Sequence, residues 1–423
     1  MNAREAAFKT LCEILYNDAF SNLALKETLG RERDMSREDR ALVTNLVYGV
    51  VSHHYTLEYI IGQYSSIKLK KLARNVKVIL ELGIYQLVYA DKIPESAAVN
   101  ESVRLAKKHG RKGADRFVNA VLRSFCRDGC EVRFPEDKAE YLAVKYSYTT
   151  DMAQQWINDF GFDEAEELMT SLNEPPALML RANTLKISAQ ELIKRLCDAG
   201  IKAEQEQGAL IRTSGFDVGG SRLYLDGYFS VQDKGAYNAA IALAPQEGES
   251  VIDMCAAPGG KTTHIAELQK DRGRITAFDI YAHKIRLIED SAHRLGIKSV
   301  EARLADASVR DETLLNSADR VLCDVPCSGW GIIRRKPDIK LGRNDVSGLP
   351  GLQGRILENA SVYVKPGGVI VYSTCTINKR ENENVTDAFL KNNDNFEKVY
   401  EKTFLPDTDG SDGFYICKLI RNA

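Results

Sequence analysis

Apolar residues in the first 140 positions of the chain recur at the spacing of an α-helix. Over residues 76–88 and 117–125 they return every three or four positions, so each stretch presents one stripe for burial. Turn-forming residues interrupt this pattern at Gly62, Pro94, Gly110 and Gly113. We therefore predict an all-α domain over residues 1–140.

The next part of the chain changes from a helical to a mixed pattern. After further helix, short apolar runs at residues 177–181 and 209–212 are typical of strands. Between these runs, Ser188 and Glu191 have the spacing of a capping box at the start of a helix. We predict a helical linker and a small α/β subdomain over residues 141–235.

From about residue 245 onward, strand and helix patterns alternate. The expected strands are residues 250–254, 274–280, 300–304, 319–323 and 368–373. Such alternation predicts a Rossmann-like α/β domain, here residues 236–423, with a parallel sheet covered by helices on both faces. Ligands of these domains bind at the carboxyl ends of the strands.

Composition narrows the class of protein. The chain is 44% hydrophobic and 27% charged, as in ordinary soluble proteins, and no apolar run reaches the ~20 residues that span a bilayer. The first residues lack the features of a signal peptide, so we expect a cytoplasmic protein. Nine cysteines, an odd number, do not indicate a disulfide framework. Because their spacings do not match zinc sites and no histidine pair completes a ligand set, we expect no metal.

Basic residues are concentrated in the predicted helical domain. The net charge of the chain is −2, yet residues 1–140 hold 23 Lys or Arg against 19 Asp or Glu. One basic run covers residues 68–77 and a second covers residues 104–127. Either run alone is explained as well by a solvated helix face, but two runs in one positive domain favour contacts with a phosphate backbone. We expect Arg334, Arg335 and Lys336, further along the chain, to add contacts of the same kind.

A loop of small residues follows the first strand of the α/β domain. After Asp253 the chain reads Cys255, Ala256, Ala257, Pro258, Gly259, Gly260 and Lys261, and then enters a helix. Small residues let a ligand approach the backbone, and the helix start offers free N–H groups. The loop matches neither the dinucleotide-binding fingerprint nor the P-loop. The alternative to a cofactor-binding loop is a tight turn without a ligand. An adenosine with a non-phosphate tail fits better, which predicts S-adenosylmethionine as the cofactor.

Acidic residues at the ends of the next two strands extend this prediction. Asp279 ends the second strand and can accept hydrogen bonds from both ribose hydroxyls, as in dinucleotide sites. Asp306 follows the third strand, where it can meet an adenine edge.

Two cysteines also follow directly on predicted strands. Cys327 lies in the run Asp324-Val325-Pro326-Cys327, and Cys375 follows Thr374 at the end of the last expected strand. Most cysteines are inert small hydrophobes, and we interpret the remaining ones so. These two, however, should border one crevice. A thiolate there could add to C6 of a cytosine, which makes C5 nucleophilic enough to accept a methyl group, while the second thiol serves in release.

Two charged residues complete the predicted catalytic set. Asp324 could protonate or hydrogen-bond the ring at N3 and N4, and Lys261 could contact the ring carbonyl or Asp324 itself. The alternatives are a turn residue for Asp324 and a surface charge for Lys261.

Taken together, these motifs resemble those of the RsmB/Sun-type bacterial 16S ribosomal RNA (cytosine-5)-methyltransferases, over nearly the whole chain. Residues 41–49 and 117–123 are similar to a NusB-like helical domain, and residues 175–183 and 232–233 to segments that lead into the catalytic domain. The departures are small; Thr376, for example, stands where serine is usual.

The resemblance implies roles for individual residues. Cys375 would attack and Cys327 would assist release, while residues 255–261, Asp279, Asp306 and Asp324 would bind S-adenosylmethionine. The substrate would be a cytosine in small-subunit ribosomal RNA, flipped into the pocket, before or during subunit assembly. We expect a monomer without membrane or metal partners.

Alternative functions remain open at this point. A transfer RNA methyltransferase uses the same chemistry, and a non-catalytic RNA-binding or antitermination factor could retain the fold. A DNA enzyme would leave Cys375 unexplained. A redox role for Cys323 and Cys327 is the weakest option, because their spacing is not the redox motif.

Overall fold

The computed structural model describes residues 2–32, 34–343 and 345–423, which form two compact units. The first unit comprises residues up to Asn173 together with the later segment Lys336–Arg343. The second comprises residues 174–335 and 345–423.

The first unit is helical. Its elements are α1 (Ala3–Tyr16), α2 (Ser21–Arg31), α3 (Arg37–Ser52), α4 (His54–Tyr64), the 3₁₀ turn η1 (Leu69–Lys71), α5 (Arg74–Tyr89), α6 (Glu95–His109), α7 (Ala114–Arg127), α8 (Lys138–Tyr146), α9 (Thr150–Phe160), α10 (Phe162–Ser171) and η4 (Pro337–Leu341). Several starts carry the side-chain caps that the first backbone N–H groups require; Asn2, for instance, accepts from the N–H of Glu5.

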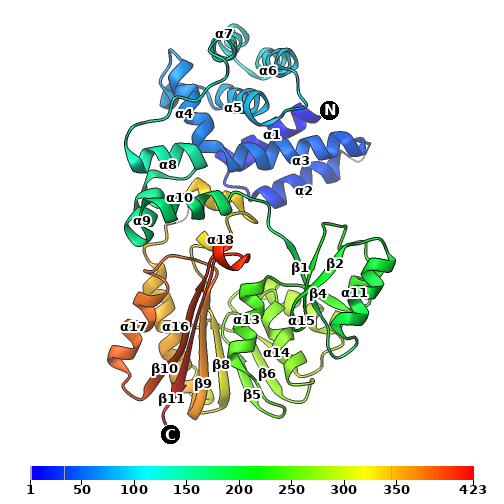
Figure 1. Cartoon of the computed structure of the whole chain (residues 1–423), viewed down its shortest axis with the longest axis vertical. Coiled ribbons are helices and arrows are strands. Elements are labelled where there is room, and N and C mark those ends of the chain that lie inside the picture. The colour runs from blue at the N-terminus through cyan, green and yellow to red at the C-terminus, as the bar shows by residue number, and fades with distance from the viewer. Residues whose placement is uncertain (1, 33, 344) are drawn as a thin grey trace. The chain divides into compact units, whose positions relative to one another are not determined.

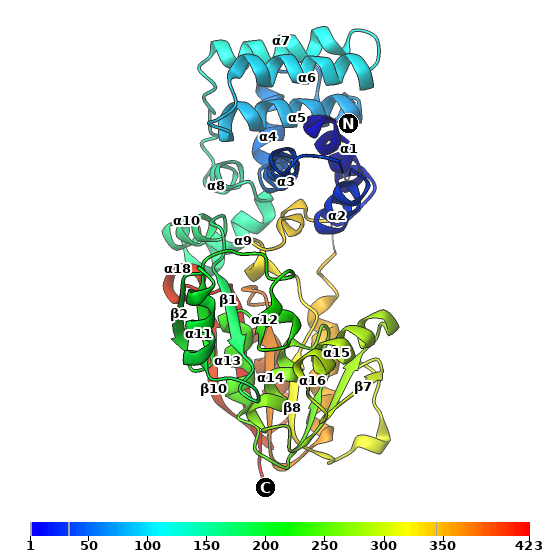
Figure 2. The ribbon, with the colours of Figure 1, turned by 90° about the vertical axis from the view of Figure 1, so that its right-hand side faces the viewer.

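Helix α5 forms the centre of this unit. It packs against α1, α3, α4, α6 and α7 (Figures 1 and 2). Its apolar stripe is fully buried at Ile79, Leu80 and Ile84, which confirms the helix predicted from residues 76–88. Val118, Val121 and Leu122 of α7 join the same core, as their spacing predicts.

The segment Lys336–Arg343 is held in the helical unit by polar contacts. The Asp338 carboxylate accepts two hydrogen bonds from Ser21, one from its backbone N–H at 2.9 Å and one from its hydroxyl at 2.6 Å. Asp338 thereby caps the start of α2. Lys340 is buried, with its ammonium over the ring of Tyr148. Its three acceptors, at 2.7–3.0 Å, are the carbonyl oxygens of Ser52 and Tyr146 and the side-chain oxygen of Asn173.

The second unit contains a small antiparallel sheet. Its strands are β1 (Leu178–Ala182), β2 (Ala203–Gln207), β3 (Leu210–Thr213) and β4 (Phe229–Val231), in the order β2-β3-β1-β4. Helix α11 (Ala189–Asp198) packs on it and begins at Ser188, whose side chain accepts from the N–H of Glu191. The predicted start of this helix is thereby confirmed. The short helix α12 (Arg222–Leu225) precedes β4.

The larger sheet of this unit has seven strands in the order β10-β11-β9-β8-β5-β6-β7. The strands are β5 (Ser250–Asp253), β6 (Arg274–Asp279), β7 (Val300–Leu304), β8 (Ala318–Asp324), β9 (Val364–Thr374), β10 (Phe396–Phe404) and β11 (Phe414–Arg421). Neighbouring strands from β9 to β7 pair in parallel, as the alternating pattern predicts. Strands β10 and β11 pair antiparallel, so the sheet is mixed rather than wholly parallel.

Helices cover both faces of this sheet (Figure 1). One face packs against α13 (Lys234–Leu243), α14 (Gly260–Leu268) and α15 (Ala282–Leu295), and the other against α16 (Leu349–Tyr363) and α17 (Glu383–Asn392). The remaining short elements are η2 (Glu312–Leu314), η3 (Trp330–Ile332) and α18 (Pro406–Asp409). No helix among the described residues combines the length and the apolar character that crossing a membrane demands.

Candidate active site

The predicted catalytic residues gather at the carboxyl ends of three neighbouring strands. β5, β8 and β9 are adjacent and parallel, and they end at Asp253, Asp324 and Thr374. In the β8–β9 register, Asp324 stands opposite Ser373, so Cys375 begins the loop beside the turn that follows Asp324. Residues that are distant in the chain, Asp253, Asp324 and Thr374, thereby lie side by side at the carboxyl end of the sheet.

The two thiols lie next to each other. The Sγ atoms of Cys327 and Cys375 are 3.3 Å apart, and both residues are partly exposed. The hydrogen bond to Cys375 and then burial raise the pKa of Cys327 well above its ordinary value. The structure thus brings together the two cysteines whose sequence positions predicted a shared crevice.

Lys261 and Asp324 form an ion pair at this crevice. Lys261 Nζ donates to Asp324 Oδ2 at 2.7 Å, and Ser373 Oγ donates to Asp324 Oδ1 at 2.8 Å. Burial alone would lower the pKa of Lys261, but the charge and hydrogen bond of Asp324 outweigh it, so the pKa is raised. A smaller contribution in the same direction comes from Cys375. Both side chains therefore lie at this crevice, paired with each other, rather than on an open surface.

A buried carboxylate that the sequence analysis missed holds the loop of Cys327. Glu381, fully buried, accepts from the N–H of Ser328 at 2.8 Å and from the side chains of Gln353 at 3.0 Å and Asn378 at 2.8 Å. Its negative charge contributes to the raised pKa of Cys327. Nothing in the local pattern around Glu381 distinguishes it from a surface acid.

The loop after β5 borders a cavity of about 190 Å³. Its lining includes Cys255, Ala256, Ala257, Pro258, Gly260 and Lys261, together with Gln232, Asp253 and Asp324. Gly259 turns the chain into α14 with φ of 99°, a conformation that L side chains rarely adopt, and an added Cβ would lie 3.2 Å from the backbone of Ile288. Burial raises the pKa of the Cys255 thiol well above its usual range, which suits a packing role.

The cavity is lined by Asp253, a buried carboxylate with one oxygen that accepts no hydrogen bond from the described residues. Asp253 accepts from Thr262 Oγ1 at 2.7 Å through Oδ2, whereas its buried Oδ1 has no hydrogen-bond partner among the described residues. Burial, and then the nearby Asp324, raise the pKa of Asp253 to about 7. An unpaired acceptor beside small residues and a helix start fits S-adenosylmethionine, which carries an ammonium and an adenosine.

Asp279 and Asp306 lie further along the same sheet edge. Asp279 ends β6, is largely buried, and accepts from the N–H of Tyr281 at 3.0 Å. Asp306 is exposed after β7, and its Oδ1 accepts from the N–H and hydroxyl of Ser308. Neither belongs to the lining of the 190 Å³ cavity, so their contacts with ribose and adenine stay predictions.

A second group missed from the sequence fixes the start of α14. Arg181, fully buried in β1, donates to both carboxylate oxygens of Glu267 at 2.8 and 2.9 Å and to the carbonyl of Gly260 at 2.7 Å. It also donates to Thr263 and Gln232. A lone arginine in an apolar strand was the available signal, because such a charge needs buried partners.

The basic residues of the sequence analysis divide into two kinds. Those of residues 104–127 are exposed on α6, α7 and the turn between them, in accord with a surface able to meet phosphates. Arg334 and Arg335 were expected to add phosphate contacts with Lys336. Instead, Arg334 pairs with Asp412 at 2.5 Å, and Arg335 pairs with Asp412 and with Asp233 at 3.1 Å. They hold the segment after Cys327 in place.

Comparisons with known proteins place this geometry in a family. The model for 16S rRNA methyltransferase RsmB/F matches residues 240–420. The NusB family model matches residues 1–127, and a ferredoxin-like domain model of RsmF/B-like methyltransferases matches residues 151–214. The chain is 36% identical to the probable ribosomal RNA small subunit methyltransferase B of Bacillus subtilis, over 99% of this chain and 98% of that protein. The chain belongs to the RsmB/F family of 16S rRNA methyltransferases.

Other relatives agree with this assignment. The ribosomal RNA small subunit methyltransferase B of Klebsiella pneumoniae is 32% identical and covers 92% of each chain. The solved structure of the protein PH0851 has a TM-score of 0.82 with 25% identity, over 98% of this chain and 97% of that one. Family membership confirms the expected fold, the S-adenosylmethionine cofactor and the class of S-adenosylmethionine-dependent rRNA (cytosine-5)-methyltransferases.

Proposed function

We propose that this protein methylates C5 of a cytosine in 16S ribosomal RNA through a covalent bond between Cys375 and C6 of the ring. S-adenosylmethionine supplies the methyl group, bound by residues 255–261 and Asp324 with Asp279 toward the ribose. The observation that carries the proposal is the 3.3 Å separation of the Cys327 and Cys375 sulfurs beside the Lys261–Asp324 pair.

Electrostatics support Cys375 as the attacking thiolate. Two thiols this close share at most one negative charge, because a second would be strongly repelled. The carboxylate of Glu381 disfavours a charge on Cys327, whereas the ammonium of Lys261 interacts favourably with a charge on Cys375. The shared charge is therefore more stable on Cys375, and Cys327 remains a thiol in the resting site.

The proposed steps use the residues in a fixed order. The Cys375 thiolate adds to C6 and pushes electron density through C5 toward N3, which takes a proton from the Lys261–Asp324 pair through Asp324, held in place by Ser373. C5 then takes the methyl group as the sulfonium–methyl bond breaks, which leaves S-adenosylhomocysteine. Cys327, whose own proton has passed to solvent, accepts the C5 proton; the C5=C6 double bond re-forms, the Cys375 thiolate leaves, and N3 returns its proton to the Lys261–Asp324 pair.

Single cysteine variants test these roles. Cys375→Ser should lose methyl transfer, because a hydroxyl is a much weaker nucleophile at neutral pH. Cys327→Ser should bond to RNA but release it slowly, so that a protein–RNA adduct survives denaturing electrophoresis. Cys197→Ser, at an exposed position on α11, is the matched control and should behave as the unmodified protein.

The outcomes separate the assignments cleanly. An adduct in Cys375→Ser together with normal turnover in Cys327→Ser would reverse the two roles. The target is tested separately, by offering 16S rRNA transcripts, transfer RNA and assembled small subunits to the unmodified protein. We expect methyl transfer to free or partly assembled 16S rRNA, and preferential methylation of transfer RNA would contradict the proposed substrate.

A further inference from the structure

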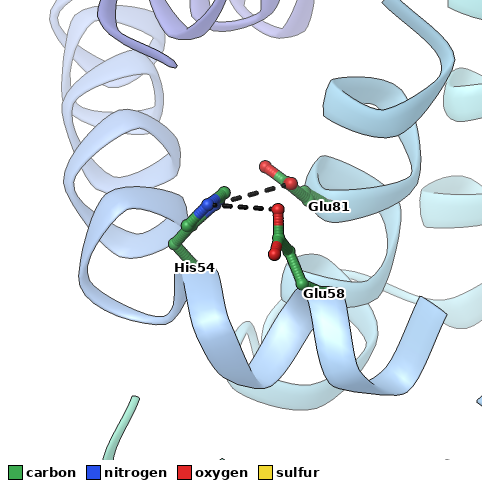
Figure 3. A group of neighbouring side chains, drawn as sticks. All are labelled: His54, Glu58 and Glu81. Atoms are coloured by element: carbon green, nitrogen blue, oxygen red, sulfur yellow. Dashed lines mark ion pairs between the residues drawn. The ribbon is translucent and has the colours of Figure 1, made fainter. Parts of the chain in front are cut away.

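A group of three ionisable side chains lies inside the helical unit, apart from the active site. His54 and Glu58 stand one turn apart on α4, and Glu81 faces them from the middle of α5 (Figure 3). His54 Nε2 is 3.3 Å from Glu58 Oε1, and His54 Nδ1 is 3.5 Å from Glu81 Oε1. Among the residues that the structure describes, this is the group with the donors to hold a metal ion.

The side chain of Glu81 accepts no hydrogen bond, although it is fully buried, within the described part of the chain. The cation beside it is His54, whose Nδ1 forms an ion pair with Glu81 Oε1 at 3.5 Å (Figure 3) but makes no hydrogen bond. Buried carboxylates normally accept hydrogen bonds or ligate a cation at short range, so the bare oxygens of Glu81 point to a further ligand.

We propose that His54, Glu58 and Glu81 bind one divalent transition-metal ion, with Zn²⁺ as the test ion. Imidazole nitrogen and carboxylate oxygen are both ligands that Zn²⁺ accepts, and three protein ligands leave the fourth position for a solvent molecule. One ligand atom from each residue can be chosen so that all lie within 4.8 Å of one another. Ligand atoms of a tetrahedral site stand about 3.4 Å apart at ordinary Zn–N and Zn–O lengths. Small side-chain rotations therefore complete the site.

The competing explanation is an ion cluster without metal. Lys77 pairs with Glu58, and a protonated His54 between the two carboxylates would balance their charge. That arrangement leaves both Glu81 oxygens and His54 Nδ1 without hydrogen bonds, whereas a bound ion would ligate the ring and one of those oxygens. Metal binding requires that Lys77, 19% exposed, turn toward solvent and that the proton on the His54 ring be released to solvent. The site also runs against the absence of metal predicted from sequence, which considered cysteine spacing and histidine pairs alone.

Calorimetry on the full chain tests this assignment. Because the adjacent active-site thiols can themselves bind Zn²⁺, the protein carries Cys327→Ser and Cys375→Ser, is stripped with a chelator, and is titrated with Zn²⁺. We expect one equivalent bound, and Glu81→Gln should weaken the binding by more than about tenfold. Glu13→Gln, an exposed carboxylate on α1, serves as the matched control and should leave it unchanged.

A second variant guards against misfolding. Glu58→Gln changes a ligand that is 21% exposed, so its effect on folding is smaller than that of a change at Glu81. Added Zn²⁺ should raise the melting temperature of the parent protein but not of either ligand variant. The proposal fails if the parent binds no Zn²⁺, or if both glutamine variants bind it as tightly as the parent.

Discussion

Replacing Arg181 by methionine should strongly destabilise the second unit, which holds the candidate active site and is called the catalytic unit below. The reason is that the buried carboxylate of Glu267 would lose its cation. Arg181 and Glu267 are both buried and are joined by two hydrogen bonds. Burial already raises the pKa of Glu267, and Arg181 opposes that rise. Breaking such a pair from one side costs about 3–5 kcal/mol. That is a large part of the ~5–15 kcal/mol by which domains are stable.

A double variant, Arg181→Met with Glu267→Met, separates the cost of an unpaired buried charge from the loss of hydrogen bonds and packing contacts. Methionine at both positions removes both charges, and apolar replacement of a whole buried pair is often neutral. Three other polar groups lose hydrogen bonds to Arg181, so we expect a residual loss of about 1–2 kcal/mol. Arg181→Met and Glu267→Met should therefore be far from additive, with a coupling of at least about 2 kcal/mol.

Urea unfolding of the full chain measures these differences. The chain has two tryptophans, Trp156 in the helical unit and Trp330 in the catalytic unit, so ¹⁹F spectra of fluorotryptophan-labelled protein report on each unit. Arg222→Met removes a cation that is 84% exposed and should change stability little. If Arg181→Met unfolded at the urea concentration of the parent, or the double variant lost as much as the two single variants together, the reasoning would be refuted.

Three further changes test other parts of the structure. The pKa of Asp253 is about 7 in the folded protein and lower in the unfolded chain. Its contribution to the free energy of unfolding is therefore full below ~pH 4 and is lost as the pH rises to 7. In Asp253→Asn, the urea midpoint should fall less between these two pH values than in the parent protein. Lys340→Met removes the buried ammonium that bonds Ser52, Tyr146 and Asn173. The Tyr146 carbonyl and the Asn173 side chain keep other donors, so the stability of the helical unit, followed at Trp156, should fall by about 1–2 kcal/mol; an unchanged transition would contradict the role of this contact. Replacing the exposed residues Lys107 and Arg111 by glutamate together should weaken RNA binding and reduce its salt dependence. If this double variant bound RNA as tightly as the parent protein at every salt concentration, the surface of residues 104–127 would not be an RNA contact.

Local patterns were enough to predict helix α5, the parallel strands of the larger sheet and the position of the thiols. The apolar periodicity of residues 76–88 predicted helix α5, although the helix is buried on nearly all sides, since every residue from Val78 to Gln86 is buried. Cys327 and Cys375 could be placed together because each follows a parallel strand, and the carboxyl ends of such strands share one edge. In both cases the information lies within a few residues of the feature.

Pairings between distant polar residues could not be predicted in the same way. Glu81 and His54 are far apart in the chain, and neither neighbourhood indicates that they meet. The antiparallel strands β10 and β11 were missed because their pairing is set by the exposed edge of β9 rather than by an alternating pattern. Glu381 likewise gains its importance from two donors distant in the chain, the N–H of Ser328 and the side chain of Gln353.

The segment Lys336–Arg343 couples two parts of the protein that a domain diagram would separate. It begins nine positions after Cys327, yet Asp338 and Lys340 make their bonds within the helical unit. The polypeptide therefore enters that unit twice, and no single cut yields two complete pieces. A fragment starting at residue 174 would keep Lys340 but lack every one of its oxygen partners. Unfolding of the helical unit would likewise release Lys336–Arg343, the segment that follows Cys327 in the chain. Loss of order in the helical unit should therefore lower methyl transfer in the other unit.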